Sequence, residues 1–399
     1  MSRFRVMACC MALTDVILAS IPTPPAQPPF ASPAPAFPTA WFGANPQAFD
    51  YRNPQQLQSM RGYRAVFMSW PEMMVATNWT NGTEIMANAC EGFKNALGPN
   101  GTAVFGYNQG QAAPLFYPEV LALTEDLDTY GDFFLGYNKT TRTVDRNSTT
   151  FCDQMQIKPD TPETKNCLAY WWNLCNDEAI DYYINTVLGN MVSKGGKRRN
   201  MDGLFIDWAG NFQDSLCPGQ NMKVHLKTFQ LLQKYDMWPI FSLAGTTAEA
   251  TLLWSAGVGY TQFSEYWTPN DANIGELYNL TELMGVPSVV HTPIIHARSP
   301  HTAIVDAVAG YLIGAGGATH SYLMYGTSWT SDKGWPWSPL FDIKYGKPLG
   351  PPTRSTVGNN TVWERKFTSG AVATVTCEPQ SRSCPGNITG INLPPLSHA

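Results

Sequence analysis

Short apolar runs rich in β-branched and aromatic residues alternate along the chain with longer stretches of helical periodicity, a pattern typical of parallel βαβ units. The runs predict eight strands, at Trp41 to Asn45, Ala65 to Trp70, Ala103 to Asn108, Gly203 to Asp207, Pro239 to Ala244, Tyr260 to Glu265, Ser288 to Thr292 and Thr319 to Met324. Helices are predicted between most of them, at Glu84 to Leu97, Glu178 to Lys194, Met222 to Tyr235, Ile274 to Met284 and Thr302 to Gly314. This alternation predicts an α/β fold, a single (β/α)8 TIM barrel over residues 39–345 with its chemistry at the carboxyl ends of the strands.

The remaining segments predict additions to this barrel. The stretch 115–174 is too long for one connection, so we expect an insertion after the third strand, placed over the barrel mouth. Residues 346–399 are predicted to form a C-terminal β extension. Within it, Thr361 to Thr368 and Ala371 to Cys377 alternate around the turn Ser369-Gly370, which indicates a hairpin.

The amino terminus is typical of an exported protein. Arg3 and Arg5 precede the apolar run Val6 to Leu18, and small residues follow, so residues 1–20 are predicted to be a signal peptide. Residues 21–38 hold eight prolines and form a predicted extended linker. Eight sequons for N-glycosylation agree with secretion, at Asn78, Asn81, Asn100, Asn138, Asn147, Asn279, Asn359 and Asn387.

The number and spacing of the cysteines also agree with secretion. The mature chain would keep seven cysteines, an odd number that leaves one thiol unpaired. Their spacing makes local bridges plausible between Cys377 and Cys384 and among Cys152, Cys167 and Cys175. Cys-x-x-Cys and His-x-x-x-His spacings do not occur, so no metal site is predicted.

Charge and hydrophobicity exclude several classes of partner. The formal net charge is −5, and the longest basic tract is Lys197-Arg198-Arg199, which disfavours nucleic acid. No run reaches the roughly 18 to 20 apolar residues of a membrane span, so no stable membrane insertion is expected. Oligomeric state is not indicated by the sequence.

Two acids close predicted strands. Asp207 ends the run Gly203 to Asp207. Because side chains alternate along a strand, Asp202 and Asp207, five residues apart, are expected to face opposite ways, with Asp207 at the catalytic rim and Asp202 near the opposite end of the barrel. Glu265 ends the sixth predicted strand, two strands after the one that Asp207 ends. A carboxylate pair of this kind hydrolyses glycosidic bonds, with retention at separations of about 5 to 5.5 Å and inversion at about 6.5 to 9.5 Å. We therefore expect Asp207 to act as nucleophile or base and Glu265 as general acid or acid/base, with water as the only co-substrate and no cofactor.

Aromatic and polar residues gather at the same predicted rim. Sugar rings stack on aromatic faces, and polar groups bind their hydroxyls. The residues expected to bind substrate are Trp70, Tyr107, Asn108, Trp172, Trp208, Tyr266, Trp267 and His291. A poly- or oligosaccharide is thus the predicted partner.

Three short segments resemble known families. Asp202 to Asp207 resembles the Asp-Gly-x-x-x-Asp strand of barrel glycosidases such as glycoside hydrolase family 31, where the final Asp is the nucleophile. Tyr345 to Pro351, followed by Trp363 to Val372, is similar to the Gly-x-Pro-Leu-Gly stretch and Arg-x-Phe-x-x-Gly-x-Val hairpin of the hypothetical glycosyl hydrolase family 15 group. The resemblance implies a barrel in which Asp207 is the acid of strand four and Glu265 the acid of strand six.

Other interpretations stay open at this point. Asp207 also fits the N-cap of a following helix. The same aromatic residues and sequons fit a non-catalytic, carbohydrate-binding barrel of an extracellular coat. A polysaccharide lyase needs basic residues to neutralise the charge of a uronate. It ranks last, because Arg298 is nearly the only basic residue at the predicted rim.

Overall fold

The computed structural model describes residues 40–42, 54, 57, 62–68, 79–97, 102–144, 168–207, 209, 216–242, 247–293, 302–326 and 337–393. The predicted signal peptide and linker lie outside these residues, as do Trp70, Trp208, Cys152 and Cys167. Within the described part, no helix combines the length and the apolar character needed to cross a membrane.

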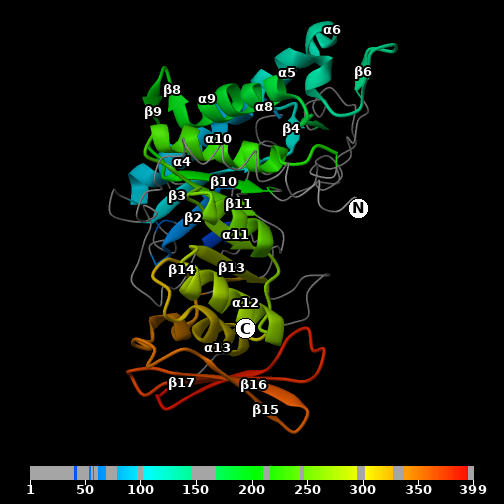
Figure 1. Ribbon diagram of the computed structural model, residues 1–399. Helices are drawn as coiled ribbons and strands as arrows, with labels where there is room; N and C mark the ends of the chain where they lie inside the picture. The colour runs from blue at the N-terminus through cyan, green and yellow to red at the C-terminus, as the bar shows by residue number, and fades with distance from the viewer. Residues whose placement is uncertain are drawn as a thin grey trace, which may run out of the picture.

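All eight predicted strands are present and form one sheet (Figure 1). They are β1 (Ala40–Phe42), β2 (Ala65–Met68), β3 (Ala103–Gln109), β10 (Gly203–Asp207), β11 (Trp238–Ser242), β12 (Thr261–Ser264), β13 (Ser288–Pro293) and β14 (Ser321–Gly326). Each strand pairs in parallel with the next one along the chain. This is the strand order of a (β/α)8 barrel. Among the described residues, the end strands β1 and β14 do not pair with each other, so the barrel is open at that seam.

Aromatic contacts across the sheet show that it curls. Phe67 of β2 and Phe263 of β12 are four strands apart, which in a flat sheet means about 19 Å at roughly 4.8 Å per step. Their ring centroids are only 6.1 Å apart. Phe205 of β10 stacks on Phe67 at 5.4 Å and meets Phe263 at 4.9 Å. The three rings therefore fill the inside of a curved sheet, and the strand ends around them share one rim.

Helices lie on the outer side of the sheet (Figure 1). The predicted ones are present as α4 (Gly82–Leu97), α8 (Asp177–Tyr182) continuing through the π-helix η2 (Tyr183–Leu188) into α9 (Gly189–Val192), α10 (Gln220–Lys234), α12 (Asp271–Tyr278) with the π-helix η3 (Asn279–Leu283), and α13 (Ile304–Ala315). Helix α11 (Thr247–Ser255) is additional. Asparagine side chains begin two of them: Asn176 accepts from the amides of Glu178 and Ala179, and Asn270 from that of Asn273.

The described part of the insertion lies beside α8 and η2. It contains α5 (Pro118–Thr124), α6 (Leu127–Tyr130), the 3₁₀ turn η1 (Gly131–Phe133) and the short strands β5 (Tyr137–Asn138), β6 (Thr143–Val144) and β7 (Ala169–Trp171). Strand β4 (Ala112–Pro114), just before the insertion, pairs with β7. The Tyr182 hydroxyl of α8 donates to the carbonyl of Glu119 at 2.9 Å, which ties the insertion to this helix. Its position over the mouth stays a prediction. A small hairpin, β8 (Ser193–Lys194) and β9 (Lys197–Arg198), follows α9.

The predicted C-terminal hairpin is confirmed, but it belongs to a larger sheet. Strands β16 (Asn360–Lys366) and β17 (Val372–Cys377) are flanked by β15 (Thr353–Val357) and β18 (Gly386–Thr389), all antiparallel, after the 3₁₀ turn η4 (Pro339–Asp342). One face of this sheet covers α13, which explains why that helix is apolar nearly all round. Arg365 anchors the sheet by a buried, bidentate ion pair with Glu282 at 2.5 and 2.6 Å.

Two disulfides join described cysteines. The predicted bridge Cys377–Cys384 is confirmed. Cys175 instead pairs with Cys217, 42 residues away, so the prediction of a local partner for Cys175 was wrong. This bridge joins Cys175, just after the insertion, to the segment before α10, a pairing that the local spacing of the cysteines does not reveal. Among the described cysteines, Cys90 is free and buried.

Candidate active site

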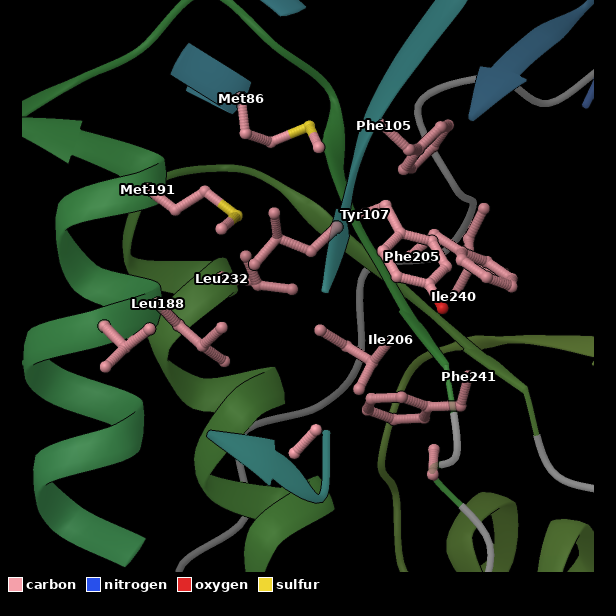
Figure 2. Close-up of a cluster of buried hydrophobic side chains, with 14 of the residues drawn as sticks. Met86, Phe105, Tyr107, Leu188, Met191, Phe205, Ile206, Leu232, Ile240 and Phe241 are labelled. Carbon is pink, nitrogen blue, oxygen red and sulfur yellow. The ribbon is translucent and has the colours of Figure 1, made fainter. Parts of the chain in front are cut away.

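Asp207 lies at the carboxyl end of β10 on the inner face of the sheet. Phe205, two residues earlier, points into the aromatic core, so the alternation of the strand turns Asp207 the same way. Figure 2 shows Phe205 beside Tyr107 on one side of β10, while Ile206 points to the other side. Asp207 is half-buried. Its backbone carbonyl accepts from the amide of Gly110 at 2.8 Å, which holds the strand end against β3.

Glu265 follows the last residue of β12 and stands over the same core. The ring of Phe263, two residues earlier, lies edge-on to Phe205 at 4.9 Å. Because these two rings touch, the backbones of Asp207, at the end of β10, and of Glu265, one residue beyond β12, lie beside the same group of core rings. Glu265 is half-buried, like Asp207.

Tyr107 of β3 contacts Asp207 directly. Its hydroxyl donates to Oδ2 of Asp207 at 2.6 Å. Burial, and after it the charge of Asp207, hold the pKa of Tyr107 well above its usual value, and the charge of Glu265 acts in the same direction. The phenol therefore stays protonated and acts as a donor. A hydrogen bond donated to a carboxylate stabilises its ionised form.

Tyr266, Trp267 and His291 form one side of this rim. Tyr266 has a left-handed backbone, with φ of 56°, which is unusual for a large side chain and typical of functional loops. Its ring lies 6.4 Å from that of His291. The amide of Trp267 donates to the carbonyl of His291 at 2.8 Å, which joins the loop after β12 to β13. Trp267 and His291 are buried, so Tyr266 presents the accessible aromatic face.

Two predicted binding residues lie away from the acids. Asn108 follows Tyr107 and faces the opposite side of β3, where its amide donates to the Tyr117 hydroxyl at 3.2 Å and accepts from Tyr183 at 2.8 Å. Trp172 is fully buried beside Phe134 and Tyr183. The structure thus does not bring Asn108 and Trp172 to the rim. Trp70 and Trp208 lie outside the described residues.

Asp202 lies at the amino end of β10, as predicted. Its Oδ2 accepts from the amide of Val104 at 2.7 Å and pairs with Nζ of Lys94 at 2.8 Å. This buried pair joins the start of β10 to the last turn of α4, and Asp207 is the acid at the other end of the strand. Among described residues, no group of three or more His, Cys, Asp or Glu side chains is placed to hold a metal ion.

Two cavities adjoin Tyr266. One, of about 190 Å³, lies between β12 and α12 and is lined by Glu265, Tyr266 and Glu276. The second, of about 540 Å³, lies between Tyr266, the start of α12 and the loop that the disulfide Cys377–Cys384 closes. Reasoning from the sequence missed the second cavity, because its two walls are more than 100 residues apart in the chain.

Comparisons with known proteins give distant likenesses. A debranching enzyme of Nostoc punctiforme aligns with 81% of this chain and 76% of its own, at 10% identity and a TM-score of 0.42. A GH27 β-L-arabinopyranosidase from Geobacillus stearothermophilus, solved with arabinose, aligns with 86% of this chain and 84% of its own, at 10% identity and a TM-score of 0.46. A comparison with curated proteins finds no significant match.

One family profile matches part of the chain. Residues 295–371 match the family described as Hypothetical glycosyl hydrolase family 15. This segment contains Gly346 to Gly350 and most of the hairpin motif that begins at Arg365, but not the strand that carries Asp207. In the region that the family profile covers, the chain is thus similar to a glycosyl hydrolase family.

Proposed function

We propose that the protein is a secreted glycoside hydrolase that cleaves glycosidic bonds of a poly- or oligosaccharide. Asp207 acts as nucleophile, or as base if the reaction inverts, and Glu265 as general acid or acid/base. The observation that carries this proposal is that each acid follows, by two residues, one of two core rings that touch, Phe205 and Phe263, and that Tyr107 donates a hydrogen bond to Asp207. The match of residues 295–371 to a glycosyl hydrolase family supports the broad class.

The chemistry assigns different protonation states to the two carboxyls. Asp207 has to be ionised, and the short hydrogen bond from Tyr107 favours that state. Glu265 has to carry a proton to the leaving oxygen, and a nearby carboxylate favours the neutral form of a second carboxyl. Tyr266 offers an aromatic face beside Glu265 for stacking on a sugar ring.

Secretion is part of the proposal. Disulfides persist in oxidising compartments, and two join described cysteines. All five sequon asparagines within the described residues are exposed, as a glycan requires: Asn81, Asn138, Asn279, Asn359 and Asn387. Release of the protein into culture medium, with a mass decrease after N-glycosidase treatment, would test this part.

A panel of α- and β-linked aryl glycosides and oligosaccharides tests the activity. Asp207→Asn and Glu265→Gln should each lower the rate about 10²- to 10⁴-fold, the usual effect of an acid–base group, while thermal unfolding stays unchanged. Asp128→Asn, at an exposed position of α6, is the matched control and should keep full activity. Sugar binding without cleavage by the wild-type protein would instead favour a non-catalytic carbohydrate-binding barrel.

A further inference from the structure

The cavity of about 540 Å³ lies between the barrel and the C-terminal sheet, next to the proposed catalytic rim. One wall is the segment from Tyr266 to Ala272, which leads from β12 into α12. The other is the loop between Cys377 and Cys384, with Glu378, Gln380 and Arg382 facing the cavity. Its volume lies within the range of about 300 to 1,000 Å³ that small-molecule sites occupy. We call this cavity the loop cleft.

The disulfide loop is held firmly against the barrel. The amide of Cys384 donates to the carbonyl of Pro269 at 2.7 Å, and the hydroxyl of Thr268 donates to the carbonyl of Arg382 at 2.6 Å. Both half-cystines are buried. The covalent bridge and these hydrogen bonds give the loop cleft a wall that exists before any ligand arrives, which reduces the entropy lost on binding.

The opposite wall is fixed by a charge pair. Asp271, at the start of α12, accepts from Nε and Nη2 of Arg354 at 2.8 and 2.7 Å and from the indole of Trp363 at 2.9 Å. Its carboxylate is therefore already engaged. Arg382 and Gln380 are exposed, and within the described residues their side chains take part in no hydrogen bond or ion pair. These two side chains are available to a ligand.

The loop cleft begins at Tyr266, the residue that follows Glu265. Tyr266 lines both the loop cleft and the smaller cavity that contains Glu265. Its left-handed backbone turns the chain sharply at the boundary between them. The loop cleft thus lies one residue along the chain from the proposed general acid, with Tyr266 between them.

We propose that the loop cleft is an accessory subsite for the outer, uncharged sugar units of an oligosaccharide whose bond is cut at Asp207 and Glu265. This rests on the proposed function for the site beside it. Arg382 and Gln380 donate to sugar hydroxyls, Glu378 accepts from them, and Tyr266 stacks on the ring at the boundary. The adjacent opposite charges of Arg382 and Glu378 suit a neutral sugar better than an anionic one. The bridge Cys377–Cys384 keeps the wall in place.

Binding and turnover test the subsite separately. Titration calorimetry with maltopentaose, cellopentaose, xylopentaose and mannopentaose is run on the Asp207→Asn protein, which retains the loop cleft. One pentasaccharide should bind, and Arg382→Ala in that background should raise its Kd about tenfold or more, since it removes a charged donor. Ala272→Trp should weaken binding further by filling the loop cleft. Lys347→Ala and Leu349→Trp change exposed positions outside it and are the matched controls.

In turnover, the ratio of kcat/KM for the pentasaccharide to that for the aryl glycoside of the same sugar should fall about tenfold in Arg382→Ala. The Cys377→Ser, Cys384→Ser double variant should show the same fall, with circular dichroism to confirm that it is folded. Failure of all four pentasaccharides to bind, or equal Kd values in Arg382→Ala and Lys347→Ala, would overturn the subsite. Binding that depends on Arg382 in a protein that hydrolyses nothing would support the subsite and contradict the hydrolase.

Discussion

The hydrogen bond from Tyr107 to Asp207 leads to the sharpest prediction. Tyr107→Phe keeps the ring that packs on Phe205 and removes only the hydroxyl. A hydrogen bond to a charged group contributes about 1.5 to 3 kcal/mol. At about 1.4 kcal/mol per factor of ten, kcat/KM should fall roughly 10- to 150-fold. At 2.6 Å the contact is short, as charge-assisted bonds are, which favours the upper part of that range.

The pH profile gives an independent readout of the same bond. Without the donor, the ionised form of Asp207 loses stabilisation, so the acidic limb of kcat/KM should move to higher pH in Tyr107→Phe. The basic limb should stay in place, because the pKa of Tyr107 lies well above its usual value and the phenol does not ionise in the working range. Tyr117→Phe, which removes a buried hydroxyl bonded to the neutral Asn108, is the matched control. Wild-type activity and an unshifted acidic limb in Tyr107→Phe would refute the role assigned to this bond.

Three further predictions concern stability, each measured by urea unfolding. Arg365→Ala leaves Glu282 buried without its partner and should cost about 3 to 5 kcal/mol, whereas an effect below about 1 kcal/mol would contradict the anchoring role. Burial lowers the pKa of His225 to about 4, so wild-type stability should decrease by about 2 kcal/mol from pH 7 to pH 5, and His225→Gln should lose that dependence. Phe263→Ala should cost about 3 to 5 kcal/mol by opening the group of core rings; a smaller loss would mean that the rings do not pack closely.

The barrel strands β2, β3, β10, β11, β12 and β14 could be predicted because each is a nearly continuous buried run. Strand β10 occupies the predicted residues, Gly203 to Asp207, since four buried positions end sharply at an acid. The edge strand β15 was missed because all five of its residues are exposed, so it carries no alternation. The five-residue spacing places Asp202 and Asp207 at opposite ends of β10, and alternation turns them to opposite faces.

The same rule, applied to β3, would have separated two candidate residues. Tyr107 and Asn108 are neighbours, so they cannot both face the barrel interior, and only Tyr107 does. The burial of Trp172 depends on Phe134 and Tyr183, which no local pattern connects to it. The pairing of Cys175 with Cys217 and the loop cleft depend in the same way on contacts between distant segments.

The separation of the two carboxyl groups tests the central claim most directly. It can be measured in a crystal structure of Asp207→Asn with a bound pentasaccharide. We expect the scissile oxygen to lie between residues 207 and 265, with the two side-chain ends about 5 to 9.5 Å apart. Side chains that open into different compartments, or a separation above that range with no sugar unit between them, would contradict the proposed hydrolase.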